Sequence, residues 1–202
     1  MYFEAEKRKQ ILLLNFFSNS VQMGVTCVFG LIGLLYVVPK YEISFSAQKL
    51  LLVLVGLLSL GVLGYFFKEK QLILKGLSIV KVVKHIQKFS SEITWKVILY
   101  SILKYLVFSY LFYQFLLFFG ASIVFSEAMP IIFCMYLLVS LIPTIFIFDL
   151  VVRGGVAVWL FSMAGIAELT VLSTVLAMWL LNVVLPAVWG SYYVAKFKLI
   201  SQ

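Results

Sequence analysis

The sequence predicts an all-α integral membrane protein: a polytopic bundle of about six membrane-embedded helical segments, some of them broken or re-entrant. Apolar residues make up 64% of the 202 positions and charged residues 12%, and the mean hydropathy is +1.12. A soluble domain is usually about half apolar and a quarter charged, and a chain of this size exposes too much surface to bury such an excess. We therefore expect a single transmembrane domain over residues 1–202, surrounded by lipid.

Five apolar runs approach or exceed the length of about 20 residues that a membrane-spanning helix needs. They cover residues 11–38, 50–67, 97–119, 128–148 and 169–194. A sixth and shorter run, residues 154–168, is expected either to cross the bilayer or to form half of a re-entrant hairpin. Pro143 and Pro186 lie within these runs and predict broken helices, which membrane proteins tolerate where the backbone lines a cavity.

Residues 68–96 have a different character, with seven lysines and two glutamates. Apolar residues recur at helical spacing from Ile73 to Ile86, which predicts an amphipathic helix on the headgroups. A solvated charged connector is the alternative. Because strongly positive loops stay in the cytoplasm, this segment and the basic N-terminus are placed inside, in a multi-pass protein of the cell (inner or plasma) membrane.

Residue types that carry common enzyme chemistry are scarce. The single histidine, His85, lies in the basic segment, and no phosphate-cradling P-loop is present. The basic residues are not interleaved with stacking aromatics, which argues against nucleic-acid binding. We therefore expect no enzyme activity, no catalytic residue, no metal and no cofactor.

One charge pair interrupts the apolar sequence. Asp149 and Arg153 are spaced i, i+4, which places opposite charges on one face of a helix. An ionisable group at membrane depth is by default a functional hypothesis, and the planar fork of Arg153 suits a lipid phosphate. The alternative is a hydrated loop between two spans.

Further polar residues are candidates for the same headgroup site. Glu127 and Glu168 flank this region; each is either a headgroup contact or a marker of a helix end at the water interface. Asn15, Asn19 and Gln22 share one face of the first span. That face either lines a polar groove or joins another helix by hydrogen bonds.

Three stretches carry a likeness to a known family: PTIFIFDLVVRGG at 143–155, WLLNVVLPAVWG at 179–190 and NSVQMGVTCVFGLIGLLY at 19–36. Together they resemble the lysylphosphatidylglycerol synthase transmembrane-region family, also called flippase-like. Many members carry Pro-Gly-Gly-Leu-Gly and then Glu where this chain reads FDLVVRG, so Asp149 and Arg153 would serve in place of that motif. Members are commonly longer before the first span, which suggests an N-terminally truncated member. The soluble aminoacyl-transferase domain of some relatives is absent from the 202 residues, so the resemblance implies lipid handling rather than lipid aminoacylation.

These features predict a protein that binds or translocates an anionic or polyprenyl-type lipid through a polar groove. Arg153 would hold the phosphate, Asp149 would position Arg153, and the polar face of the first span would solvate the path. The alternative is a structural or partner-binding membrane subunit without transport activity, in a homo-oligomer or with another membrane protein. Small residues suited to helix contact, such as Gly56, Gly61 and Gly64, motivate that alternative.

Overall fold

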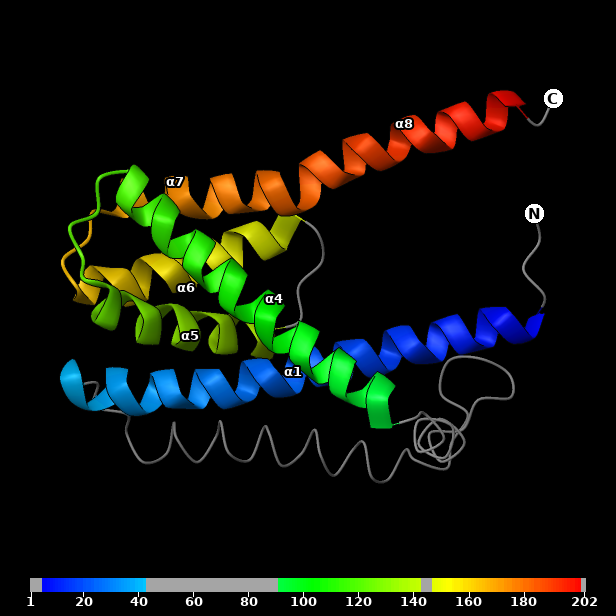
Figure 1. Cartoon of the computed structure of the whole chain (residues 1–202). Coiled ribbons are helices and arrows are strands. Elements are labelled where there is room, and N and C mark those ends of the chain that lie inside the picture. The colour runs from blue at the N-terminus through cyan, green and yellow to red at the C-terminus, as the bar shows by residue number, and fades with distance from the viewer. Residues whose placement is uncertain (1–4, 43–90, 143–146, 201–202) are drawn as a thin grey trace. The chain divides into compact units, whose positions relative to one another are not determined.

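The computed structural model describes residues 5–42, 91–142 and 147–200, and the regular structure in these ranges is entirely helical (Figure 1). The all-α prediction is thereby confirmed for the described residues. The predicted span 50–67 and residues 68–90 of the basic segment lie outside them. The chain divides into two compact units, Met1–Val25 with Glu42–Leu103 and Thr26–Tyr41 with Lys104–Gln202. Each unit is considered by itself.

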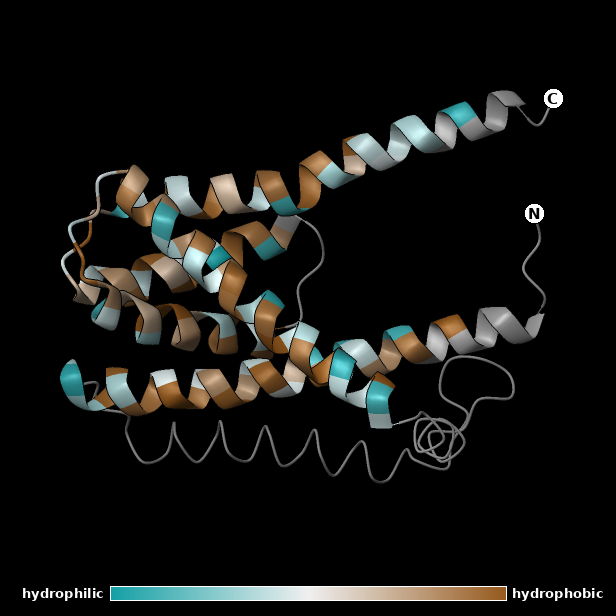
Figure 2. Cartoon of the chain, viewed as in Figure 1, coloured by the Kyte–Doolittle hydropathy of each residue, from teal (hydrophilic) through white to brown (hydrophobic). Residues whose placement is uncertain are grey.

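Three helical stretches in the described residues are long and apolar enough to cross a membrane: Leu14–Lys40, Ser91–Phe118 and Glu168–Tyr193. Hydrophobic residues run along each of these helices (Figure 2), and many of their large apolar side chains are exposed. Leu35, Phe118 and Leu169 are 77%, 78% and 77% exposed. Such a surface is stable in lipid and costly in water, so the fold supports a membrane protein.

The first two of these stretches correspond to α1 (Ala5–Lys40) and α4 (Ser91–Phe118), which confirm the predicted spans 11–38 and 97–119. Helix α4 starts earlier than predicted, so residues 91–96 belong to the helix and not to the basic connector. Glu92 in the first turn complements the positive end of the helix dipole. It also pairs with Lys96 one turn later at 2.5 Å.

The predicted span 128–148 is wrong in its boundaries. Helix α5 (Phe125–Leu141) ends before Pro143, and α6 (Ile147–Met163) begins four residues after that proline. The residue before a proline is driven out of the helical region by a steric clash with the ring. Ile142 accordingly has extended angles, φ −102° and ψ 104°. Most of the run 154–168 is therefore the second part of a helix that starts at Ile147 and ends at Met163, while Glu168 already belongs to the next helix.

Two glycines stop helices at the same end of the bundle. Gly120 after α4 and Gly165 after α6 have φ of 90° and 72°, a region that suits glycine because it has no Cβ. At each stop the two hydrogen bonds of a Schellman turn close the helix. After α6, for example, Gly165 N–H donates to Ser162 at 3.0 Å and Ile166 N–H donates to Phe161 at 3.1 Å.

The last predicted span, 169–194, is confirmed as one continuous stretch built from α7 (Glu168–Trp179), the π-helical segment η2 (Leu180–Val184) and α8 (Leu185–Ile200). Pro186 explains the π-helical turn. Proline has no N–H for the carbonyl four residues earlier and its ring clashes with that carbonyl. Widening the turn, with Leu185 N–H bonded to the Leu180 carbonyl, lets the helix continue through the proline.

The core of the second unit lies between α4, α5, α6 and α7, which run in alternating directions (Figure 1). Phe112 of α4 stacks on Phe161 of α6 with ring centroids 6.0 Å apart, and both rings are almost fully buried. Met135 of α5 and Val171 of α7 are fully buried. This packing fixes the helices that carry the polar groups of the candidate site.

The C-terminal half of α1 packs on α5 with almost no space between the backbones. A methyl group on Gly33 would lie 2.7 Å from the backbone nitrogen of Cys134 and closer still to the carbonyl oxygen of Pro130. A methyl group on Gly30 would collide with the Leu137 side chain. Small residues at a helix interface permit this approach, which is a common source of association energy in membranes.

Candidate functional site

The predicted pair of Asp149 and Arg153 is formed. Both residues lie on α6, and Nη2 of Arg153 donates to both carboxylate oxygens of Asp149, at 3.3 Å and 3.2 Å. Each side chain is 29% exposed. The charges therefore sit in a helix, partly shielded from solvent, and not in a hydrated loop.

The geometry of this pair leaves guanidinium donors of Arg153 that Asp149 does not engage. A guanidinium has five N–H donors in a planar fork and binds a carboxylate most strongly when two different nitrogens take part. Here one nitrogen, Nη2, makes both contacts, and both distances exceed 3.0 Å. Asp149 thus holds Arg153 in place and engages only one of its guanidinium nitrogens.

Tyr136 on α5 is the neighbour of Arg153 that the sequence did not suggest. Its phenol is close enough to interact electrostatically with the guanidinium. The Tyr136 hydroxyl donates to the backbone carbonyl of Phe108 on α4 at 3.4 Å, which is long for such a bond. Tyr136 therefore joins α5 to α4 within electrostatic range of the charged pair on α6.

An aromatic cluster continues from Tyr136 across the second unit. The ring of Tyr105 on α4 meets Tyr136 edge-on, with centroids 5.8 Å apart. Phe29 of α1 stacks on Tyr105 at 5.1 Å, and Phe133 of α5 lies 5.5 Å from it. The sequence showed that this part of α4 is rich in Phe and Tyr, but no spacing rule singled out Tyr105.

The hydroxyl of Tyr105 has an unusual environment. The residue is 4% exposed, and its hydroxyl oxygen is inaccessible and has no hydrogen-bond partner in the part of the chain that the structure describes. Buried tyrosine hydroxyls usually find a partner, because an unpaired polar group costs free energy.

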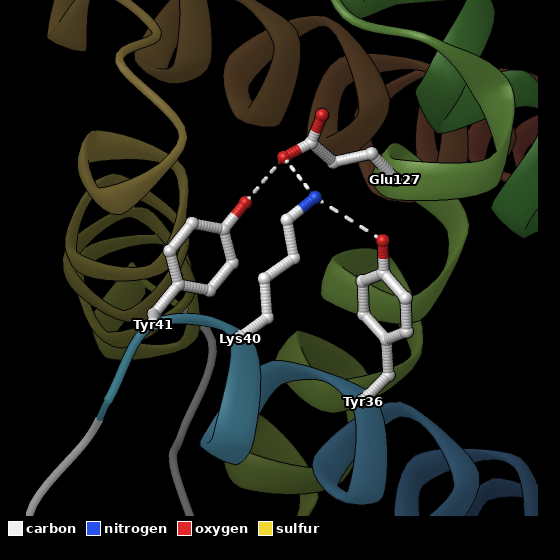
Figure 3. A network of polar contacts seen from close by, with 4 residues as sticks. All are labelled: Tyr36, Lys40, Tyr41 and Glu127. Atoms are coloured by element: carbon white, nitrogen blue, oxygen red, sulfur yellow. Dashed lines mark hydrogen bonds and ion pairs between the residues drawn. The ribbon is translucent and has the colours of Figure 1, made fainter.

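Glu127 belongs to a different cluster (Figure 3). Its Oε1 accepts hydrogen bonds from Nζ of Lys40 and from the hydroxyl of Tyr41, both at 2.6 Å. Lys40 also donates to the Tyr36 hydroxyl at 3.1 Å, and its ammonium lies over both tyrosine rings, 5.2 Å and 5.6 Å from their centroids. The network ties the end of α1 to the start of α5.

The electrostatics of this network are favourable. Lys40 lies in the last turn of α1 and Glu127 in the first turn of α5, so each charge complements a helix dipole. Hydrogen bonds from Lys40 and Tyr41 hold the pKa of the Glu127 carboxyl below its ordinary value. Burial, and then the hydrogen bond to Glu127, raises the pKa of Tyr41 to about 12.

The two predicted glutamates, Glu127 and Glu168, are not gathered at Arg153 in the described structure. Glu168 is exposed in the first turn of α7, as expected for a marker of a helix end. Glu127 begins α5 and Asp149 begins α6, so the alternation of these helices places the two carboxylates at opposite ends (Figure 1). The predicted grouping of Glu127 and Glu168 with Arg153 is therefore not seen.

The polar face of the first span lies in the other compact unit. Asn15 and Asn19 are exposed on α1, and Gln22 is half-buried and engaged in an interaction. Their participation in a groove with Arg153 stays a prediction. Within the described ranges, no group of three or more His, Cys, Asp or Glu side chains could hold a metal ion. The chemistry that the arrangement offers is anion binding by Arg153.

Comparison with known protein families, with curated proteins and with solved structures finds no match. The resemblance of residues 143–155 and 179–190 to the flippase-like family therefore stays a prediction.

Proposed function

We propose that this protein binds and translocates a membrane lipid with an anionic headgroup, and that Arg153 holds the lipid phosphate. The observation that carries the proposal is the state of Arg153: a half-buried guanidinium on an apolar helix, held by Asp149 through one nitrogen. Charges in membrane segments are costly and are kept where they act on ions or headgroups. A phosphate would take the donors that Asp149 does not engage.

The direction of the helices supports a proposal for the depth of this site in the bilayer. Lysine-rich segments stay in the cytoplasm, which favours a cytoplasmic position for the start of α4. Since α4 to α7 alternate in direction (Figure 1), α6 begins on the cytoplasmic side, and Arg153 in its second turn lies near the inner leaflet. The Lys40–Glu127 network then lies at the outer end. In this arrangement Arg153 receives its lipid from the inner leaflet.

Lipid translocation in proteoliposomes tests the proposal. Headgroup-labelled anionic lipids are reconstituted with the protein, and an impermeant quencher reports the fraction that reaches the outer leaflet. We expect quenching beyond the initial outer fraction with the wild-type protein, and its loss in Arg153→Ala. Arg153→Lys keeps the charge without the planar fork, and we expect it to retain part of the activity.

The chain provides a matched control in Lys96→Ala. Lys96 and Glu92 form the same i, i+4 arrangement early in an apolar helix, but their side chains are 60% and 75% exposed. This control removes one positive charge without touching the proposed site, so translocation should be kept. Unchanged translocation in Arg153→Ala would remove Arg153 from the mechanism. Absence of translocation for all lipid classes, together with co-purification of a second membrane protein, would favour the alternative of a partner-binding subunit.

A further inference from the structure

We infer that the buried hydroxyl of Tyr105 donates a hydrogen bond to an ester carbonyl of the bound lipid, which makes the substrate a diacyl glycerophospholipid and not a polyprenyl phosphate. This inference rests on the proposed function, because it extends the site that begins at Arg153. Its basis is the hydroxyl itself, which is buried without a partner in the described part of the chain.

A buried donor without an acceptor requires an explanation in a well-packed bundle. A phenylalanine at this position would fill nearly the same volume and avoid the cost of the unpaired group. We therefore expect the Tyr105 hydroxyl to act in a ligand-bound state, in which an acceptor for its hydrogen bond is present. Burial excludes bulk water as that acceptor, so a ligand oxygen is the natural candidate.

The neighbours of Tyr105 define the chemistry of that ligand. The rings of Phe29, Phe133 and Tyr136 surround it, with centroids 5.1 to 5.8 Å away. The portion of a ligand at this point must therefore be mainly apolar with one oxygen acceptor. An ester carbonyl at the head of an acyl chain has this character.

The order of the groups follows the order of a phospholipid. Arg153 and Asp149 on α6 form the charged end, Tyr136 on α5 lies within electrostatic range of Arg153, and Tyr105 on α4 is in ring contact with Tyr136. A glycerophospholipid carries its phosphate, its glycerol and its ester carbonyls in the same order as these protein groups. A polyprenyl phosphate has a hydrocarbon directly after its phosphate and offers Tyr105 no acceptor.

A lipid oxygen can reach the Tyr105 hydroxyl only if a side chain that packs on Tyr105 moves away. Phe29 of α1 stacks on the Tyr105 ring and is itself half-exposed. For a lipid oxygen to reach the hydroxyl, the Phe29 ring has to change rotamer and give up its contacts with Tyr105 and Phe133, at 5.1 Å and 5.2 Å. Phe29 is thus the group that would leave when a lipid enters.

The test compares two lipids on the full-length protein: a diacyl phosphatidylglycerol and its dialkyl ether analogue with the same chains and no ester carbonyls. Binding is measured by native mass spectrometry of the purified protein in detergent. We expect the wild-type protein to bind the ester lipid about three- to tenfold more tightly, the effect of one hydrogen bond. In Tyr105→Phe the two lipids should bind equally.

Tyr105→Phe should also raise the melting temperature of the lipid-free protein, because it removes an unpaired buried hydroxyl. The matched control is Tyr113→Phe, the same change on the same helix, where the hydroxyl donates to the Ile123 carbonyl at 3.4 Å. We expect this control to leave the preference for the ester lipid unchanged and not to raise the melting temperature.

The outcomes separate this inference from the proposed function. Equal binding of ester and ether lipids to the wild-type protein, with binding lost in Arg153→Ala, would overturn the role of Tyr105 and leave Arg153 in place. An ester preference that persists in Tyr105→Phe would also overturn it. Failure of the wild-type protein to bind either lipid would overturn the proposed function and this inference together.

Discussion

Gly33 sets the distance between α1 and α5, and replacing it with alanine is expected to destabilise the protein. The added Cβ would lie 2.7 Å from the backbone nitrogen of Cys134, where ordinary contacts begin at 3.4 Å, so at least about 0.7 Å of separation is missing. The nearest obstacle, the Pro130 carbonyl oxygen, is also backbone. No side-chain rotation can relieve this clash, and the helices themselves must move apart.

The cost can be estimated from the contacts that such a movement weakens. A gap of 0.5 to 1 Å already forfeits about a quarter to a half of the dispersion energy of each contact. Overpacking of this kind typically costs about 1–3 kcal/mol. For a chain of this size we expect the melting temperature to fall by about 2–10 °C. Thermal unfolding of the purified protein in detergent, followed by circular dichroism, measures the change.

Gly155→Ala is the control for the change in composition. Gly155 lies on α6 in the same unit, and a Cβ there meets no atom within 4 Å. Alanine has a higher helix propensity than glycine, so the melting temperature of this variant should equal or slightly exceed that of the wild-type protein. If both variants lose the same stability, close packing at Gly33 is not the cause and the reasoning fails.

Two smaller predictions concern the end of α1. Lys40 and Tyr41 lower the pKa of Glu127 in the folded protein. These contacts therefore stabilise the fold fully at pH values above the ordinary pKa of 4.5, and this stabilisation is lost as the pH falls through the lowered pKa. The melting temperature of the wild-type protein should therefore fall more steeply below pH 4.5 than that of Glu127→Gln, and parallel curves would contradict this. Glu42 has a φ of 46°, in the left-handed region that is strained for a residue with a side chain. Glu42→Gly relieves a backbone strain of about 1–2 kcal/mol and adds about 0.4–1 kcal/mol of conformational entropy to the unfolded chain. We therefore expect the free energy of unfolding, measured by denaturant titration, to rise by up to about 1 kcal/mol. A loss of stability would show that the Glu42 side chain contributes more than its backbone costs.

The long helices could be predicted from the sequence because one local property determines them. A run of more than 20 apolar residues must be helical in lipid, since each backbone polar group needs a partner within its own segment. This argument gave α1, α4 and the final stretch to within a few residues, apart from the early start of α4. Another local feature, the i, i+4 spacing, indicated the Asp149–Arg153 pair, because this spacing on a helix brings two side chains together.

The division between α5 and α6 was missed because a proline has two possible effects in an apolar run. It can remain in a helix, as Pro130 does in α5, or end one, as Pro143 does through Ile142. The contact of Glu127 with Lys40 joins residues 87 positions apart. Sequence periodicity does not indicate a pairing over this distance. The environment of Tyr105 depends on three helices packing together, which the sequence of α4 alone does not specify.

The short length of α5 and α6 has a consequence for the bilayer around them. Each has 17 residues, about 26 Å at 1.5 Å per residue, whereas α4 with 28 residues extends about 42 Å. A hydrocarbon layer about 30 Å thick cannot match both lengths. Hydrophobic mismatch tilts the long helix and draws the two leaflets together beside the short ones. We therefore expect the membrane to be thinnest next to the helix that carries Arg153, so that the path between its two surfaces is shortest there.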